Sequence, residues 1–115
     1  MQTRTIYKIC TEEEWAEARR TGTYRGSQAD LRDGFIHFST GPQAAGTARQ
    51  HFAGQADLVL VSFLADDLGP GLKWEPSRGG ALFPHFYGEL PAAAARSVVP
   101  LPLSEEGHVF PELDG

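Results

Sequence analysis

Several segments of the chain carry the hydrophobic pattern of β-strands. Residues 5–10 are partly β-branched and partly alternate between apolar and polar positions, which indicates a first strand. Residues 57–63 are apolar at nearly every position, so we expect a strand in the centre of a sheet. Residues 72–75 are a further predicted strand. Residues 97–103 are another, placed at a sheet edge because its two prolines lack the N–H group that a ladder needs.

Helix signals lie between these strands. Thr11 with Glu14 three positions later is a capping-box signature, which predicts a helix over residues 12–20. Pro42 suits the first turn of a second helix over residues 42–52, where its missing N–H is not needed. Strands and helices alternate at first and mainly strands follow, with no glycine-rich dinucleotide fingerprint after the first strand. We therefore expect an α+β domain and not a Rossmann fold.

The composition is that of an ordinary soluble protein. The 115 residues are 41% hydrophobic and have a formal net charge of -5, which predicts a single domain over residues 1–115 with a loose tail at 104–115. The negative charge argues against electrostatic binding to DNA or to an anionic membrane. No segment has the pattern of a membrane span or a signal peptide, so we expect a cytoplasmic protein. Cys10 is the single cysteine, which excludes an internal disulfide and a cysteine-based zinc cluster.

Residues 74–80 and 83–88 hold the densest group of reactive and aromatic side chains. The run over residues 77–80 can turn backbone N–H groups to one side, because glycine adopts positive φ without steric cost, and such a nest binds anions. Arg78 would add a planar fork of donors for phosphate or carboxylate oxygens. His85 titrates near neutrality, and the neighbouring rings offer stacking surfaces. The alternative is that the glycines form a turn and the rings belong to the core.

A second candidate group lies in residues 35–39, which we predict as a further strand. Alternate residues of a strand point to opposite faces, so Phe35, His37 and Ser39 share one face. A histidine and a hydroxyl two residues apart on that face can form the wall of a polar pocket. The alternative is that His37 is hydrogen-bonded at the rim of the core.

Three parts of the sequence together carry a family resemblance: Ile6-Tyr-Lys-Ile9, Phe35-Ile-His-Phe-Ser-Thr40, and Trp74-Glu-Pro-Ser-Arg-Gly-Gly80 with Phe83-Pro-His-Phe-Tyr-Gly88. On these motifs the chain resembles, over nearly its whole length, the small bacterial family called Domain of Unknown Function 952. That family has no established activity, so the resemblance carries over no catalytic residues. It implies a fold similar to that of the ADP-ribosyltransferases, a split β-sheet with two main helices near the N-terminus, whose cleft holds NAD in active relatives.

The implied fold suggests roles for several side chains. His37 would hold a ribose or a phosphate, Arg78 would clamp an anion, and His85 would act as a general acid or base. These three are the candidate catalytic residues. The ring of Tyr87 would stack on the ligand. The candidate ligand-binding residues are Ser39, Thr40, Trp74, Glu75, Ser77, Gly79, Gly80 and Tyr87.

The transferases of this fold often use a late glutamate, and no glutamate here stands in a recognisable motif of that kind; Glu75 and Glu89 are the candidates. We expect a protein that binds NAD, ADP-ribose or another phosphorylated nucleotide. If it is an enzyme, we expect a transferase or NAD glycohydrolase that acts at the anomeric carbon of a ribose, with NAD as substrate. No metal is expected.

Two other functions stay open. The chain could be a non-catalytic sensor that binds a nucleotide or another small anion and reports it to a partner. It could instead be a metal hydrolase with His37, His51 and His85 as ligands, although this spacing matches no metal motif. The sequence alone does not say whether His37, Arg78 and His85 converge on one cleft, and the substrate and oligomeric state stay open too.

Overall fold

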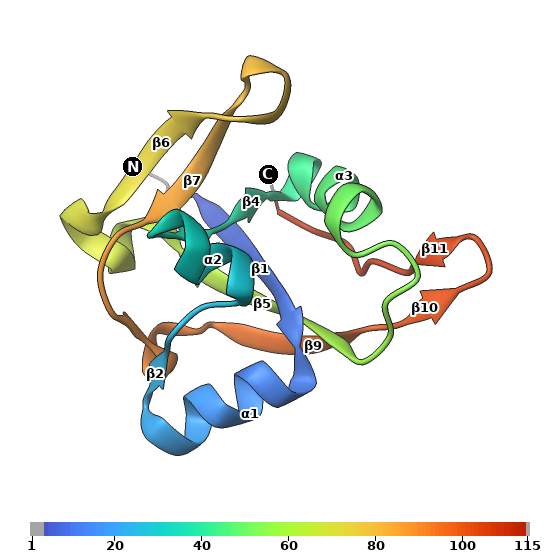
Figure 1. The fold of residues 1–115 in the computed structure, drawn as a ribbon, viewed down its shortest axis with the longest axis horizontal. Helices are drawn as coiled ribbons and strands as arrows, with labels where there is room; N and C mark the ends of the chain where they lie inside the picture. Colours follow the sequence, from blue (N-terminus) through green and yellow to red (C-terminus); the bar gives the residue numbers. More distant parts are fainter. Residues whose placement is uncertain (1–3, 115) are drawn as a thin grey trace.

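The two strands with the strongest hydrophobic pattern lie side by side at the centre of the structure (Figure 1). The structure is a computed structural model that describes residues 4–114, except for the side chain of Arg78. Strand β1 (Thr5–Thr11) pairs along its whole length with strand β5 (Leu58–Leu64) in antiparallel register. Other strands flank this pair on both sides, so the central position predicted for β5 is confirmed.

Two shorter strands complete this first sheet, in the order β4-β1-β5-β9. Strand β9 (Ser97–Leu101) pairs with β5 and forms an edge of the sheet, as its prolines predict. Strand β4 (Ser39–Thr40) pairs with β1 on the other side, at Ile6 and Tyr7. Within the described part of the chain, the same edge of β1 over residues 8–11 has no neighbouring strand. This free edge leaves room for a cleft.

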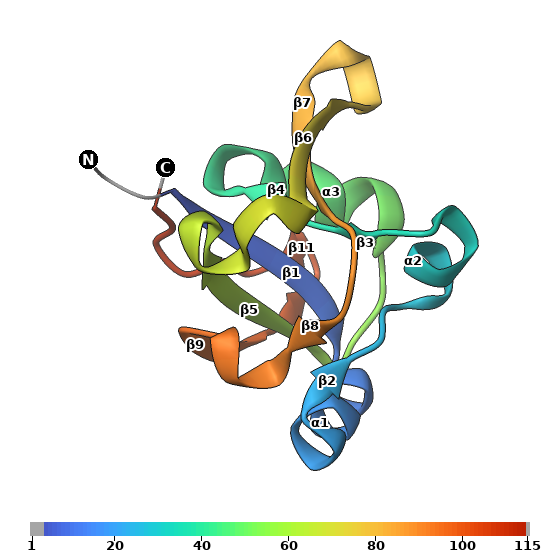
Figure 2. The same cartoon turned by 90° about the vertical axis from the view of Figure 1, so that its left-hand side faces the viewer.

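A second, three-stranded sheet is built around strand β7 (Leu82–Phe86), which lies between β3 (Ile36–His37) and β6 (Leu72–Pro76). Strands β6 and β7 form a hairpin that extends away from the rest of the molecule (Figure 2). What the sequence predicts as one strand is divided at Phe38, so that β3 joins this sheet and β4 joins the first. The N–H of Phe38 donates to the carbonyl of Pro84 at 2.9 Å, which fixes the crossing between the two sheets.

Short elements complete the fold. Four short strands pair two by two: β2 (Thr23–Tyr24) with β8 (Leu90–Pro91), and β10 (Leu103–Ser104) with β11 (Gly107–His108). Segments of 3-10 helix lie at Ala65–Gly71, Arg78–Gly80 and Ala92–Ala94. None of the helices in the described residues is long and apolar enough to cross a membrane. The chain is a mixed α+β protein with antiparallel sheets, as the sequence predicts.

Helix α1 (Glu12–Thr21) begins at the predicted capping box. The hydroxyl of Thr11 accepts a hydrogen bond from the N–H of Glu14 at 3.0 Å, and the Glu14 carboxylate accepts from the N–H of Thr11 at 2.9 Å. The helix ends at Gly22, whose φ of 90° lies in the left-handed region that glycine adopts at low cost. Both ends of α1 are therefore set by local sequence.

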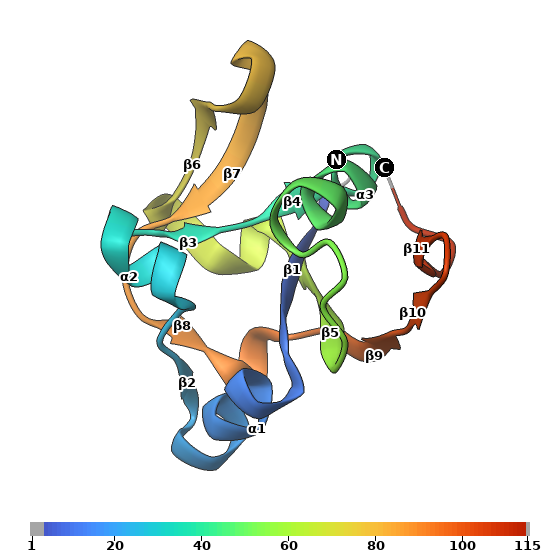
Figure 3. The ribbon, with the colours of Figure 1, turned by 45° about the vertical axis from the view of Figure 1, so that its right-hand side comes forward.

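Helices α2 (Gln28–Asp33) and α3 (Gly41–His51) approach the free edge of β1 from two sides (Figure 3). Helix α2 has a second capping box, in which the N–H of Ser27 donates to the carboxylate of Asp30 at 2.9 Å. Asp30 is buried, so this carboxylate also faces the interior. Helix α3 has a proline in its first turn, as predicted.

Alternate residues of β1 face two separate core clusters. Ile6 and Cys10 belong to the first core cluster, which lies under α1 and the second sheet. Tyr7 and Ile9 belong to the second core cluster, which includes residues of α3. Burial raises the pKa of the Cys10 thiol to about 12, so this thiol is not a nucleophile near neutral pH. Lys8 shares the face of Ile6 and Cys10 and is only 4% exposed. A charge at that position needs a partner inside the protein.

Residues 104–114 differ from the loose tail that the sequence suggests. Phe110 and Leu113 pack against the second core cluster. The N–H of Asp114 donates to the hydroxyl of Tyr7 at 2.9 Å, and a ring nitrogen of His108 donates to a backbone carbonyl at 2.7 Å. The apolar residues of this segment cover part of the core, and residue 115 lies outside the described residues.

Candidate functional site

A cleft of about 750 Å³ follows the free edge of β1, between α2, α3 and the β6–β7 hairpin. Ligand pockets typically have volumes of roughly 300–1,000 Å³, so this cleft has room for a nucleotide. Four of the candidate catalytic and ligand-binding residues line it: His37, Ser39, Ser77 and His85. The wall also holds charged residues that the sequence did not point to: Lys8, Asp30, Arg32 and Asp33.

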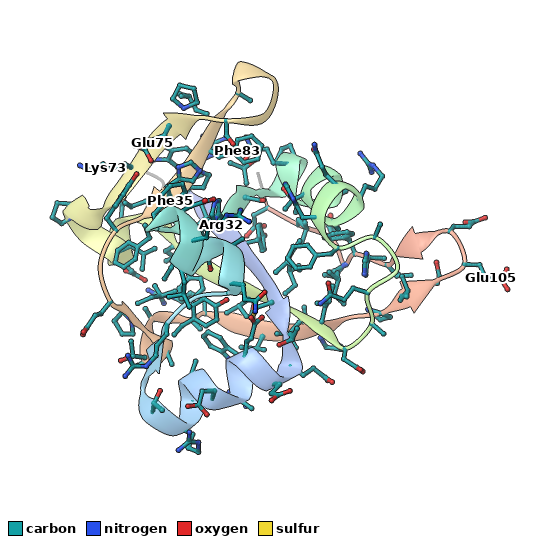
Figure 4. The ribbon with its side chains drawn as sticks, viewed as in Figure 1. Arg32, Phe35, Lys73, Glu75, Phe83 and Glu105 are labelled. Atoms are coloured by element: carbon teal, nitrogen blue, oxygen red, sulfur yellow. The ribbon has the colours of Figure 1, made fainter. Side chains whose placement is uncertain are left out.

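The two candidate catalytic histidines lie opposite each other on neighbouring strands. His37 of β3 is the register partner of His85 of β7, and their ring centroids are 5.5 Å apart. The ring of Phe35 stacks on His85 at 4.2 Å and contacts His37 at 4.5 Å. Figure 4 shows Phe35 between the hairpin that carries Glu75 and helix α2, which carries Arg32. The structure therefore brings both histidines to one wall of the cleft.

Two carboxylates of α2 hold His37. Its Nδ1 lies 2.6 Å from Oδ1 of Asp30, and its backbone N–H donates to the same oxygen at 3.1 Å. Its Nε2 lies 3.0 Å from Oδ2 of Asp33. Asp33 also contacts Arg32, whose hydrogen bond is the main reason that the pKa of Asp33 is lowered. The imidazole of His37 is thus fixed at both of its nitrogen atoms.

Lys8 contacts both Asp30 and the backbone of His37. Its Nζ lies 2.8 Å from Oδ2 of Asp30 and donates to the backbone carbonyl of His37 at 3.1 Å. Burial alone would raise the pKa of Asp30, but the hydrogen bond with His37 and the charge and hydrogen bond of Lys8 outweigh it, so the pKa lies well below its usual range. Asp30 is therefore ionised near neutral pH and forms an internal charge pair with Lys8.

The lowered pKa of Asp30 predicts that this part of the structure loses stability in acid. Because the folded-state pKa lies below the unfolded value of about 3.9, the contribution of the ionised group is fully present above that value. It is lost as the pH falls through the folded-state pKa. Urea unfolding of the wild type and of Asp30→Asn at successive pH values should show a stability difference that shrinks from about pH 5 toward pH 2. A difference that does not change with pH would contradict this assignment.

His85 is held differently from His37. Its Nδ1 lies 2.8 Å from Oε1 of Glu75, and the hydroxyl of Tyr87 donates to the same carboxylate oxygen at 2.8 Å. These hydrogen bonds, first from His85 and then from Tyr87, lower the pKa of Glu75. The bond to Glu75 raises the pKa of Tyr87. Glu75 is thus a candidate binding residue that the structure places behind the histidine, where it can orient the ring.

Three other candidate binding residues have mainly structural surroundings. Ser39 lines the cleft, and its hydroxyl lies 2.8 Å from the hydroxyl of Thr47 on α3. Thr40 is buried where β4 meets α3, and it is not among the residues that line the cleft. Trp74 packs against the first core cluster, with the guanidinium of Arg4 4.9 Å above its ring. Tyr87 is the aromatic candidate with an exposed ring, at 38%.

The glycine-rich run forms the turn of the β6–β7 hairpin. The N–H of Ser77 donates to the carbonyl of Ala81 at 2.9 Å, and the N–H of Gly80 donates to the carbonyl of Ser77 at 2.7 Å. These bonds close the turn and use two of the N–H groups that an anion nest would offer. Gly79 and Gly80 adopt the positive φ expected of them, but they are not among the residues that line the cleft. The anion clamp predicted for Arg78 rests on a side chain outside the described residues.

The sequence held one signal that could have revealed the charges behind His37. Lys8 interrupts the apolar face of the first predicted strand, at a position that shares its face with Ile6 and Cys10. A lysine on a buried face requires a carboxylate close by. Asp30 lies in a short turn 22 positions away, and nothing local connects the two residues.

Within residues 4–114, no group of three or more His, Cys, Asp or Glu side chains is placed to hold a metal ion. His51 lines the cleft together with the other two histidines of the hydrolase alternative, but the three do not form a ligand set.

A family of unknown function matches most of the chain. The family described as "Protein of unknown function (DUF952)" matches residues 9–98. Protein CC0527 from Caulobacter crescentus is similar to the chain: its X-ray crystal structure has 48% sequence identity and a TM-score of 0.87, covering 90% of this chain and 91% of that chain. The solution NMR structure of CC0527 has a TM-score of 0.81 at 48% identity and covers 90% of each chain. No curated protein gives a significant match.

Proposed function

The chain belongs to the DUF952 family, whose description names no function, and we propose from the geometry of the cleft that it binds a phosphorylated nucleotide. One observation carries the proposal. His37 and His85 form a cross-strand pair, each ring is held by a carboxylate, and both line a cleft of about 750 Å³. A polar wall built around fixed imidazoles is suited to orient the phosphate and ribose hydroxyls of such a ligand.

Among the described residues, two of the three acidic side chains that line the cleft have cationic neighbours, and the third, Glu14, accepts from the backbone N–H of Thr11. The carboxylate of Asp30 is neutralised by Lys8, and that of Asp33 lies against Arg32 and His37. These acidic groups therefore add little net repulsion toward a phosphate. Ser39 of β4 and Ser77 in the turn of the hairpin also line the cleft and add polar side chains without charge.

The crossing of the chain between two sheets supports a finer proposal about the fold. At Phe38 the chain leaves the sheet of β3 and enters that of β4, and the cleft lies where the two sheets separate. We propose that this is the split sheet of an ADP-ribosyltransferase-like fold. NAD and ADP-ribose are then the first nucleotides to consider, with transfer or hydrolysis at the ribose anomeric carbon as the reaction.

A non-catalytic binding module is the second candidate, and the state of His37 favours it. Both ring nitrogens of this histidine face carboxylate oxygens, so exchange of a proton with a ligand would require one of these contacts to break. A sensor needs only that the cleft close on its ligand, and a rigid His37 would serve that role.

Thermal unfolding in the presence of NAD, ADP-ribose, AMP, inorganic phosphate and sulfate tests the proposal. A ligand that binds only the folded state at about 100 times its dissociation constant adds about 2.7 kcal/mol, which raises the melting temperature by several degrees. We expect a shift with at least one nucleotide and a smaller shift with phosphate or sulfate. If no nucleotide shifts the wild type, the proposal fails.

Two histidine variants locate the binding site. His85→Gln removes an imidazole from the cleft wall, and His108→Gln makes the same exchange at a histidine that does not line the cleft. We expect His85→Gln to lose most of the ligand-induced shift and His108→Gln to keep it. Equal shifts in both variants would place the ligand elsewhere.

A further inference from the structure

We propose that the two histidines of the cleft have different roles, with His85 as the group that exchanges a proton with the ligand and His37 as a fixed anchor. This inference rests on the proposed function, because it assigns roles within the same nucleotide site. It keeps the division that the family resemblance implies, with His37 holding the ligand and His85 as general acid or base, and adds which ring nitrogen acts and what fixes it. Three features of the structure carry it.

The first is the use of the ring nitrogens of His37. Its Nδ1 lies 2.6 Å from Oδ1 of Asp30 and its Nε2 lies 3.0 Å from Oδ2 of Asp33, so each ring nitrogen faces a carboxylate oxygen. Asp30 is itself fixed by the buried Lys8, which leaves it little freedom to move away. His37 can therefore present its ring to a ligand, while each of its nitrogen atoms is engaged by a carboxylate of α2.

The second is the use of the ring nitrogens of His85. Its Nδ1 lies 2.8 Å from Oε1 of Glu75, and a carboxylate at that nitrogen selects the tautomer with the proton on Nδ1. Among the residues that the structure describes, no hydrogen bond to Nε2 of His85 is found. The lone pair of Nε2 is thus without a donor among the described residues, on a ring that is only 5% exposed and lines the cleft.

The third is the support behind Glu75. The hydroxyl of Tyr87 donates to the same oxygen that accepts from His85, and the ring of Phe35 stacks on His85 at 4.2 Å. Tyr87 and Glu75 are positioning residues in this scheme, because they act on the ligand only through His85. Together with Phe35 they fix the direction in which Nε2 points.

The proton transfer can be written in full. The O–H bond of a ligand hydroxyl breaks, the lone pair of Nε2 forms the new N–H bond, and the oxygen keeps the electron pair of the broken bond. The imidazolium that results faces the ionised Glu75, which stabilises its charge. A nucleotide ribose supplies hydroxyls of this kind, so the step suits the proposed ligand class.

Nitrogen-detected NMR of the uniformly ¹⁵N-labelled full chain tests the assignment without any ligand. In the wild type, His85 should show a protonated Nδ1 and an unprotonated Nε2, while both nitrogens of His37 should show hydrogen-bonded shifts. Glu75→Ala should remove the tautomer preference of His85. Glu105→Ala, which removes an exposed carboxylate outside the cleft, should leave it unchanged.

The outcomes are distinct. A proton on Nε2 of wild-type His85, or a His85 tautomer that Glu75→Ala does not alter, overturns the assignment. A ring nitrogen of His37 without a hydrogen bond overturns it as well. In a second step, adding AMP should move the Nε2 signal of His85 more than either nitrogen signal of His37. If AMP, ADP-ribose and NAD all leave every histidine signal in place while the tautomer is as expected, the nucleotide function fails and the distinct states of the two rings stand.

Discussion

Replacing Asp30 with alanine should lower the free energy of unfolding by about 3–5 kcal/mol, because the ammonium group of Lys8 would stay buried without a counter-charge. The same carboxylate accepts from the backbone N–H groups of Ser27 and His37, so the variant also leaves two donors without their acceptor. Urea unfolding at pH 7 measures the loss. A change below about 1 kcal/mol would mean that water or another group compensates Lys8.

Two further variants separate the charge pair from its surroundings. Lys8→Met with Asp30→Leu removes both charges, and it should recover part of the loss, since a buried ion pair replaced by apolar side chains is often neutral in stability. Full recovery is not expected, because the cap of α2 is still missing. Asp33→Ala removes the other carboxylate that contacts His37, which is on the same helix and partly exposed. It should lower the free energy of unfolding much less than Asp30→Ala.

The position of this pair gives it a role beyond stability. Lys8 belongs to β1 of the first sheet, Asp30 to α2, and His37 to β3 of the second sheet. The pair and its contacts with His37 therefore connect three elements that surround the cleft. A buried charge pair that joins separate elements can favour a single arrangement of them, and here that arrangement places His37 opposite His85.

The elements that local sequence determines were predictable. The capping box of α1 and the apolar run of β5 appear in the structure with bounds close to those expected. The division of the predicted strand at Phe38 was not predictable. Its residues alternate as a strand should, and which sheet each half joins depends on Pro84 and Ile6, which are distant in the chain. Alternation along one segment contains no information about such partners.

The candidate site likewise has features that local sequence predicts and features that depend on distant partners. His37 and His85 were candidates from residue type and local context, but their pairing across β3 and β7 is a property of the sheet. The glycine run was expected to bind anions, and two of its N–H groups close the hairpin because Ser77 and Ala81 are brought together by β6 and β7. Glu75, a candidate ligand contact, instead lies behind His85. Side-chain partners of this kind are fixed by packing, which a single sequence does not display.

Replacing Phe63 with alanine should cost about 3–5 kcal/mol of stability and should also disturb the cleft. Phe63 is fully buried in β5, and its ring meets Phe38 edge-on at 5.3 Å and Trp15 of α1 at 6.3 Å. Phe38 is the residue at which the chain crosses between the sheets, with His37 before it and Ser39 after it. A cavity beneath Phe38 would loosen the segment that carries both cleft residues.

A matched substitution in the second core cluster separates the loss of stability from the disturbance of the cleft. Phe110 is half-buried against the second cluster, so Phe110→Ala should cost less in urea unfolding and should leave the backbone amide signals of His37 and Ser39 in place. Phe63→Ala should shift both signals, and Phe63→Leu should shift them less, because leucine fills part of the cavity. If Phe63→Ala lost stability without any change at His37, the crossing at Phe38 would be held by the strand hydrogen bonds alone. The first core cluster would then stabilise the protein without positioning its site.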